Sequence, residues 1–364
     1  MSIPDCTLTT CCFDLTKYHK SSRTLNDCIN NMESLLKIPC YLVIYADNNC
    51  IEKVQNIRNS FGLDNLTKYI LIEINDLPKY KYLEKIYNNR EIYHPTKDER
   101  TCPENHILQL SKTDLVLKTM DDNPFHTSKF GWIDSNLGSS NCNKISENYQ
   151  NNMLLYILKN SNPDKFHIQI LNVWDKKYKE FNLKKEYYNQ YRWVVCGSFY
   201  LTGYEIGKKI LNRFNEIANN ITEQGYGHGD EMCYLEILDE YYDDIERSYG
   251  DYHHILNNFI EPTKGYHYIL NYIIIKYINF KYHKEGYDCC KKLLDQIENY
   301  KVNIDYEIYF LILFYYYISC YYYKNEEAKI IALKIKKLIS ENKYLENEYN
   351  KNKIFYDNQL NYSL

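Results

Sequence analysis

Residues 123–138, NPFHTSKFGWIDSNLG, contain the segment that decides the fold of this chain. Residues 129–134, KFGWID, predict a short buried strand that ends on the carboxylate of Asp134, and turn-forming residues follow it directly. In an open α/β sheet, ligands bind outside the carboxyl ends of the strands. Asp134 is therefore a candidate ligand for a divalent cation, together with the side-chain oxygen of Asn136. The same pattern also fits a carboxylate that only caps the turn.

Short apolar runs and amphipathic segments alternate up to about residue 260. Residues 40–46, CYLVIYA, are an uninterrupted apolar run of strand length, and residues 104–120 carry apolar side chains at helical spacing. Such an alternation is typical of an α/β fold with a mostly parallel sheet covered on both faces. We expect strands at residues 8–13, 40–46, 68–74, 129–134, 166–171 and 193–200. We expect helices at residues 25–36, 51–61, 104–120, 204–219 and 230–238.

The pattern changes near residues 261–265, EPTKG. From Tyr266 onward, tyrosine, isoleucine and leucine recur at helical spacing, which predicts tetratricopeptide-like helix pairs or a generic bundle. Because a lone α/β core does not need this apolar segment, we expect a homodimer. The expected helices are residues 266–282, 285–299, 305–323 and 326–341. The expected domains are an α/β domain at 1–262, a helical domain at 263–345 and a polar tail at 346–364.

Composition excludes several classes of protein. The 364 residues carry a net charge of −4, which offers no basic surface for nucleic acid. The hydrophobic content of 45% and the charged content of 25% are those of a globular protein. The sequence has no apolar run long enough to span a membrane, and its first residues lack the basic and apolar regions of a signal peptide. We therefore expect a cytoplasmic protein that neither crosses nor binds a membrane.

Cysteine and tyrosine are both frequent but carry little functional information. The thirteen cysteines are scattered and form no CxxC pair, so we expect reduced thiols in a reducing compartment and no zinc site. The forty-one tyrosines accompany abundant Asn, Ile and Lys, a composition typical of A/T-rich coding sequence. A single tyrosine is therefore weak evidence for a binding site.

Two further segments contain acidic or histidine side chains of the kind that active sites use. Residues 225–231, GYGHGDE, form a glycine-rich loop that leads into Asp230 and Glu231. These acids either belong to a site or only stabilise the amino end of a helix. Residues 249–258, YGDYHHILNN, place His253 and His254 near an aspartate, where they either bind a metal or move a proton, or else face solvent.

The remaining candidates follow from their positions near predicted strands and helices. Thr10 and Phe13 lie at the end of the first predicted strand, and Asp47 directly follows the second. Lys112, on the predicted helix 104–120, either neutralises a phosphate or is solvated. The sequence lacks Walker, GxGxxG, GxSxG, HExxH and kinase motifs, which excludes the familiar nucleotide hydrolases, dehydrogenases and serine hydrolases.

Taken in order, these segments resemble the HtrL/YibB-like glycosyltransferases, whose nucleotide-sugar-binding fold is of the GT-A type. The resemblance covers about residues 5–260, and its segments read TTCCFDL, YLVIYAD, SKTDLVLKTMDDNPFHTSKFGWIDSNLG, CGSFYLTG, HGDEMCYLEIL and YGDYHHILNNF. The composition and the tyrosine-rich helical segment are also similar to those of giant-virus collagen glucosyltransferases.

The resemblance implies a Mn²⁺- or Mg²⁺-dependent hexosyltransferase. It would move glucose from UDP-glucose to a galactosyl-hydroxylysine, as in a collagen-type acceptor. It implies that Asp134 binds the metal with His253, or with His254 as the alternative, and that Asp230 and Glu231 are catalytic. The implied donor-binding residues are Thr10, Phe13, Asp47, Lys112, Trp132, Asn136, Gly197 and Ser198.

Two alternatives stay open at the level of sequence. The transfer either retains the configuration of the sugar, with the leaving phosphate taking the acceptor proton, or inverts it, with Asp230 or Glu231 as the general base. The chain is such an enzyme, a glycosyltransferase that uses another UDP-sugar and a non-collagen glycan acceptor, or a catalytically degenerate scaffold whose helical segment binds a partner.

Overall fold

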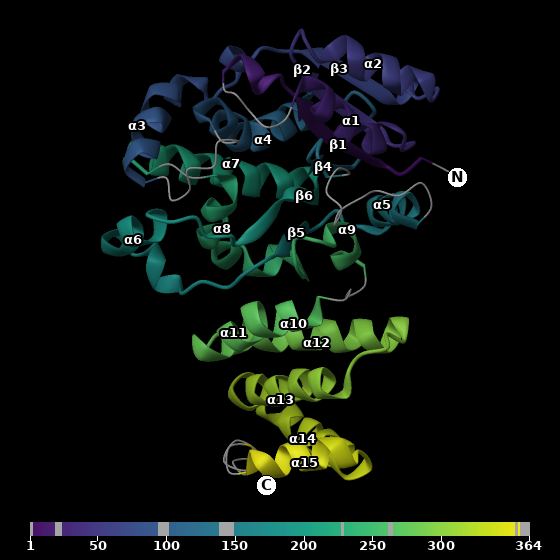
Figure 1. Cartoon of the computed structure of the whole chain (residues 1–364), viewed down its shortest axis with the longest axis vertical. Helices are drawn as coiled ribbons and strands as arrows, with labels where there is room; N and C mark the ends of the chain where they lie inside the picture. Colours follow the sequence, from purple (N-terminus) through teal and green to yellow (C-terminus); the bar gives the residue numbers. More distant parts are fainter. Residues whose placement is uncertain are drawn as a thin grey trace. The chain divides into compact units, whose positions relative to one another are not determined.

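The structure, a computed structural model, describes residues 3–18, 24–93, 102–137, 149–226, 229–260, 265–353 and 356. The chain forms two compact units, which Figure 1 shows in the colours of the sequence. The α/β unit consists of Met1–Gln169 and Lys176–Ser248, and the helical unit consists of Ile170–Asp175 and Tyr249–Leu364. The domain limits expected from the sequence, at residues 262 and 345, stay predictions.

A seven-stranded sheet forms the core of the α/β unit. Its strands are β1 (Cys6–Cys12), β2 (Tyr41–Ala46), β3 (Thr67–Leu71), β4 (Lys129–Ile133), β5 (Phe166–Ile170), β6 (Val195–Gly203) and β7 (Ile245–Tyr249). The strand order is β3-β2-β1-β4-β6-β5-β7. β1, β2, β3 and β4 pair in parallel, and β6 runs antiparallel to β4. The expected mostly parallel α/β sheet is confirmed, with β6 as an antiparallel member.

Helices cover this sheet because its strands are apolar on both faces. Every residue of β4, β5 and β6 is buried. The helices of the α/β unit are α1 (Leu25–Leu36), α2 (Ile51–Ser60), α3 (Leu83–Tyr93), α4 (Pro103–Asp122), α5 (Tyr149–Asn160), α6 (Lys184–Tyr188), α7 (Tyr204–Glu223) and α8 (Tyr234–Glu240). α4 and α7 pack against each other (Figure 1) and are joined by a 2.8 Å hydrogen bond from Thr113 to Asn215. The sequence pattern does not predict β7, α3, α5 or α6.

Gly131 allows β4 and β6 to approach closely. A Cβ atom at this position would lie 2.4 Å from the main-chain oxygen of Tyr200 and 2.6 Å from Cδ2 of Leu201. The antiparallel register pairs Ile133 with Phe199, so the start of β6 lies beside the end of β4. The carboxyl ends of β1 to β4 and the amino end of β6 therefore share one edge of the sheet, which we call the carboxyl edge.

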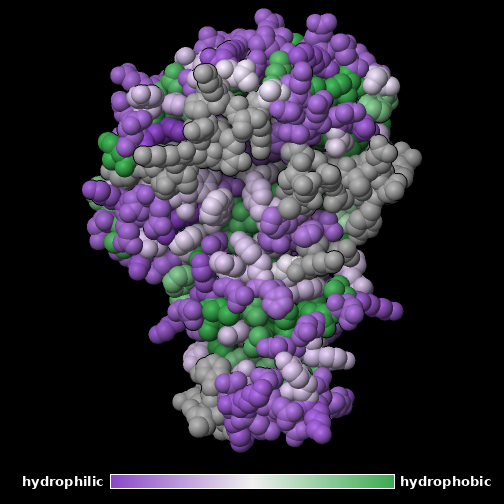
Figure 2. All heavy atoms as spheres, viewed as in Figure 1, coloured by the Kyte–Doolittle hydropathy of each residue, from purple (hydrophilic) through white to green (hydrophobic). Residues whose placement is uncertain are grey.

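The helical unit contains the helices that the tyrosine-rich sequence predicts. They are α9 (Ile255–Asn258), α10 (Tyr266–Ile269), α11 (Ile275–Asn279), α12 (His283–Tyr300), α13 (Tyr306–Tyr323), α14 (Asn325–Glu341) and α15 (Lys343–Lys351). A π-helix, Leu270–Ile274, joins α10 to α11, and α15 extends into the expected polar tail. Figure 2 shows hydrophobic residues at the surface of this unit around α10–α13. None of the helices in the described part of the chain has the length and apolar content that a membrane crossing requires.

Candidate functional site

The predicted site residues of β4, α4 and β6 meet at the carboxyl edge of the sheet. Asp134 directly follows β4, and its main-chain N–H donates a 2.8 Å hydrogen bond to the carbonyl oxygen of Ser198 on β6. The 3₁₀ turn η7 (Asp230–Cys233) brings two buried acids, Asp230 and Glu231, to the same place. The strand end, the helix and the turn thus bring three carboxylates together.

Lys112 on α4 lies at the centre of these carboxylates. Its Nζ atom is 3.0 Å from Oδ1 of Asp134 and 3.2 Å from Oδ2 of Asp230. The same ammonium donates a 3.2 Å hydrogen bond to the carbonyl oxygen of Gly197 and lies 5.7 Å from the ring centre of Trp132. Because this lysine side chain is only 12% exposed, its charge is poorly screened by water and compensates both acids.

Asp134 offers one of its two carboxylate oxygens to a ligand. Its Oδ1 atom accepts a 2.6 Å hydrogen bond from the indole N–H of buried Trp132 in addition to the contact with Lys112. Its side chain is 28% exposed, and no described residue donates a hydrogen bond to Oδ2. The indole therefore fixes the orientation of the carboxylate and leaves the second oxygen accessible.

Asp230 and Glu231 face β6 and do not simply cap a helix. Glu231 Oε2 accepts a 2.9 Å hydrogen bond from the Tyr191 hydroxyl, and Glu231 Oε1 accepts one of 3.4 Å from the main-chain N–H of Gly197. Burial, reinforced by the neighbouring Asp230 charge, raises the pKa of Glu231 to about 8. Burial also raises the pKa of Asp230, whereas the Lys112 ammonium opposes that effect. Both acids therefore hold a proton more tightly than an exposed carboxyl group does.

Gly197 is required for this approach of the acids to β6. A Cβ atom on Gly197 would lie 2.7 Å from Oδ2 of Asp230 and 3.3 Å from Cγ of Glu231. The glycine in CGSFYLTG thus makes room for the acidic pair, and its amide and carbonyl groups both contact side chains of the site.

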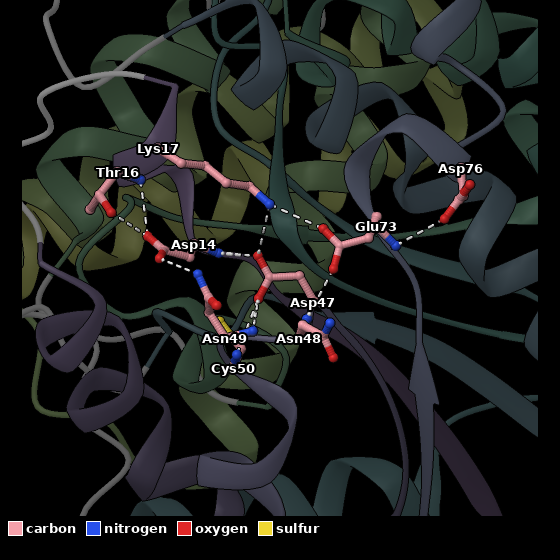
Figure 3. Close-up of polar contacts among 9 residues, drawn as sticks. All are labelled: Asp14, Thr16, Lys17, Asp47, Asn48, Asn49, Cys50, Glu73 and Asp76. Atoms are coloured by element: carbon pink, nitrogen blue, oxygen red, sulfur yellow. Dashed lines mark hydrogen bonds and ion pairs between the residues drawn. The ribbon is translucent and has the colours of Figure 1, made fainter.

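A second polar network follows the ends of β1, β2 and β3 (Figure 3). Buried Asp47 accepts a 2.8 Å hydrogen bond from the main-chain N–H of Asp14 and bonds of 3.1 Å from those of Asn49 and Cys50. Lys17 lies 3.9 Å from Asp47 and 3.0 Å from Glu73. The carboxylate of Asp47 therefore holds the loops that follow β1 and β2 in place.

The other two predicted donor-binding residues of this region are buried. Phe13 is 7% exposed. Thr10 is fully buried on β1, and its hydroxyl oxygen has no hydrogen-bond partner among the described residues. The donor-binding roles of Thr10, Phe13 and Asp47 stay predictions.

The predicted histidine ligands belong to the helical unit. His254 Nδ1 lies 3.3 Å from Oδ1 of Asp251, and the main-chain N–H of His253 donates a 3.0 Å hydrogen bond to the same oxygen. Asn258 donates a 3.1 Å hydrogen bond to the carbonyl oxygen of Asp251 and anchors the turn. The pairing of either histidine with Asp134 stays a prediction.

The oxygen ligands at Asp134 suit a hard cation that is also bound by the phosphates of a substrate. Within the described ranges, no group of three or more His, Cys, Asp and Glu side chains is arranged to bind a metal ion. Mg²⁺, however, commonly takes one or two carboxylates together with substrate phosphates and water. The accessible Oδ2 of Asp134 fits that mode of binding.

Tyr191 also belongs to this cluster, although the sequence pattern does not predict it. It lies in the segment before β6 and contacts Glu231 through its hydroxyl group. Because the chain contains forty-one tyrosines, nothing in the local sequence distinguishes this one. The structure brings Lys112, Trp132, Asp134, Gly197, Asp230 and Glu231 together, and their catalytic and binding roles stay predictions.

Comparisons with known proteins identify the family. The sequence matches, over residues 4–191, the family model described as "Bacterial protein of unknown function (HtrL_YibB)". Among solved structures, the chain is similar to the crystal structure of mouse xyloside xylosyltransferase 1 in its apo form. That match has 10% sequence identity and a TM-score of 0.37, and it covers 66% of this chain and 84% of that chain. A comparison with curated proteins found no match. Because the family model spans half of the chain and includes Lys112, Asp134 and Tyr191, the protein belongs to the HtrL_YibB family.

Proposed function

We propose that this protein is a GT-A-type glycosyltransferase that moves glucose from UDP-glucose to the galactose of a galactosyl-hydroxylysine in a collagen-type acceptor. One observation carries the proposal: Asp134, at the end of β4, is oriented by Trp132 and Lys112 and keeps one oxygen accessible. Strand ends of this kind bind ligands in open α/β sheets. The order of the sequence motifs, which resembles that of HtrL/YibB-like glycosyltransferases, supports a nucleotide sugar as the donor.

In this proposal, the donor diphosphate lies against Asp134 and Lys112. Asp134 Oδ2 and Asn136 would hold a Mn²⁺ or Mg²⁺ ion, which when bound offsets the negative charge that builds up on the leaving UDP. Lys112 supplies a further positive charge within a poorly solvated site, where such a charge stabilises the transition state most strongly. Main-chain groups of Gly197 and Ser198 form the wall beside the transferred sugar.

We assign the remaining metal ligand to His253 or His254. The contact between Asp251 and Nδ1 of His254 favours His254, because histidines that bind metals commonly donate their other ring N–H to a carboxylate. Replacing each histidine in turn by alanine, and measuring the Mn²⁺ concentration needed for half-maximal transfer, distinguishes the two.

The proposed reaction breaks the bond between the anomeric carbon and a diphosphate oxygen and forms a bond to the acceptor hydroxyl oxygen. With retention, the acceptor proton passes to the leaving phosphate oxygen. Asp230 stabilises the positive charge that develops at the anomeric carbon, and protonated Glu231 donates a hydrogen bond to the acceptor. An inverting reaction would instead need an ionised Asp230 or Glu231 as the general base.

A UDP-release assay over a panel of UDP-sugars tests the proposal, with galactosyl-hydroxylysine peptide and free galactose as acceptors. We expect UDP-glucose to be the best donor and Asp134→Asn to abolish the release of UDP. Asp121→Asn is a matched control, because Asp121 is an exposed carboxylate at the far end of α4 that contacts Lys208. Loss of activity in the control as well, or transfer by Asp134→Asn at the unchanged rate, would contradict the assignment.

The second candidate function is that of a scaffold with a degenerate transferase core. Its specific support is that Lys112 already neutralises both Asp134 and Asp230. This candidate predicts that neither UDP nor any UDP-sugar, with or without Mn²⁺, raises the melting temperature. A rise with UDP plus Mn²⁺ favours the enzyme through ligand linkage.

The assembly and location remain part of the proposal. Hydrophobic residues at the surface around α10–α13 support a homodimer through the helical unit (Figure 2), and sedimentation equilibrium measures its mass. Every cysteine among the described residues is a free thiol, which supports a reducing, cytoplasmic environment.

A further inference from the structure

An exposed tryptophan lies beside the acidic pair at the carboxyl edge. Trp193 precedes β6 and is 53% exposed. Its neighbours Arg192 and Val194 are buried, so the alternation of an extended chain directs the indole outward. Arg192 anchors this segment through hydrogen bonds of 2.9 Å to the carbonyl oxygen of Tyr187 and 3.1 Å to that of Glu186. The exposed ring is therefore held in place by a buried neighbour.

Trp193 is linked to Glu231 through Tyr191. The rings of Trp193 and Tyr191 contact each other with a centroid distance of 5.1 Å, and the Tyr191 hydroxyl donates its 2.9 Å hydrogen bond to Glu231. The aromatic pair thus extends from the buried acid to the surface. An apolar ring face next to hydrogen-bonding groups suits a ligand that is apolar on one side and polar at its rim.

Gln109 supplies an unsatisfied acceptor at the same place. It lies on α4, one turn before Lys112, and its buried Oε1 atom has no hydrogen-bond partner among the described residues. Oε1 of Gln109 and the hydroxyl oxygen of Tyr191 lie 2.8 Å and 3.0 Å from the point where a Cβ atom on Gly229 would stand. A buried acceptor without a partner costs free energy unless a ligand satisfies it. A hydroxyl group of a bound ligand would do so.

We propose that Gln109, Tyr191, Trp193 and Glu231 form the seat for the acceptor sugar, with Gly229 allowing Gln109 and Tyr191 to approach each other closely. The ligand class is a hexopyranose, whose C–H face packs on the Trp193 indole and whose hydroxyl groups bind Gln109 Oε1 and Glu231. This inference rests on the proposed function, because it assigns the second substrate of the same transfer reaction. It places the acceptor on the segment before β6, whereas the donor lies at Asp134 and Lys112.

The test compares the acceptor KM of Trp193→Ala, Trp193→Phe and Gln109→Leu with that of the unchanged protein, using free galactose and galactosyl-hydroxylysine peptide. Because an aromatic contact or a buried hydrogen bond contributes about one tenfold step in affinity, we expect Trp193→Ala and Gln109→Leu each to raise the acceptor KM about tenfold. Trp193→Phe should recover most of the loss. Gly229→Ala should raise the KM as well, because its methyl group would collide with Gln109 and Tyr191 and displace them.

Phe61→Ala is the matched control. Phe61 is an exposed aromatic residue of the same unit, 44% exposed, but it follows α2 and so lies at the opposite edge of the sheet, before β3. The control should keep the acceptor KM of the unchanged protein. If Trp193→Ala and Gln109→Leu still bind UDP and transfer the sugar with an unchanged acceptor KM, the seat is overturned and the proposed function stands. Absence of UDP binding and transfer in the unchanged protein would instead overturn the proposed function and the seat with it.

Discussion

Lys112 and Asp134 form a 3.0 Å ion pair that joins the middle of α4 to the end of β4. The same ammonium also contacts Asp230, so one positive charge compensates two carboxylates at the carboxyl edge. Removing one partner of such a buried group leaves uncompensated charge, which is far more costly than losing an exposed ion pair.

Replacing Lys112 by methionine should therefore destabilise the fold by about 3 kcal/mol. The matched variant Lys208→Met removes a partly exposed partner of exposed Asp121 and should cost about 0–1 kcal/mol. Urea unfolding measures both. Equal effects of the two substitutions would show that Lys112 is solvated and does not compensate the acids.

Gly197→Ala should destabilise the protein by about 1–3 kcal/mol and abolish transfer, because its methyl group would collide with Asp230. The double variant Gly197→Ala/Asp230→Ala removes the colliding carboxylate. It should be more stable than the sum of the two single effects indicates. Additive effects in a thermal unfolding cycle would contradict the close approach of Asp230 to β6.

The stability of the protein should fall as pH rises from about 4.5 towards 8. The folded-state pKa of Glu231 is raised from 4.5 to about 8, so the folded state binds a proton that the unfolded state has released, and rising pH favours unfolding in this window. The raised pKa of Asp230 acts in the same direction. We expect the melting temperature of Glu231→Gln to change less across this pH range than that of the unchanged protein. An equally steep fall in both proteins would show that Glu231 is not responsible.

Removal of divalent cations should abolish transfer, and the addition of Mn²⁺ should restore it. UDP should then raise the melting temperature only when Mn²⁺ is present, because Asp134 offers a single accessible oxygen and needs the phosphates to complete the coordination. Differential scanning fluorimetry with EDTA, Mn²⁺ and UDP in all combinations measures this coupling. Equal stabilisation by UDP in EDTA would argue for Lys112 as the sufficient cation.

Local sequence predicted strands that are mostly apolar, including β2 and β4, and the acid that follows β4. It missed β7, whose sequence IERSY interrupts the apolar pattern with Glu246 and Arg247. Strand pairing supplies what this short segment lacks in propensity.

The site was predictable in its residue types and not in its contacts. Asp134, Asp230 and Glu231 were recognisable as acids at a strand end and after a glycine-rich loop. That Lys112 bridges two of them depends on how α4 packs across the sheet, which no local pattern encodes. The partner of Glu231, Tyr191, was equally hidden, since it lies 40 positions away in the chain.

The antiparallel direction of β6 has an evolutionary consequence. Because β6 enters the sheet at the carboxyl edge, Gly197 lies within the buried strand, whereas Tyr191 and Trp193 lie on the connecting segment before it. Connecting segments accept substitutions and changes in length far more readily than paired strands do. If the acceptor lies on this segment, as we propose, descendants of such a protein can exchange one acceptor for another by altering the segment, without disturbing Lys112, Asp134 and Gly197.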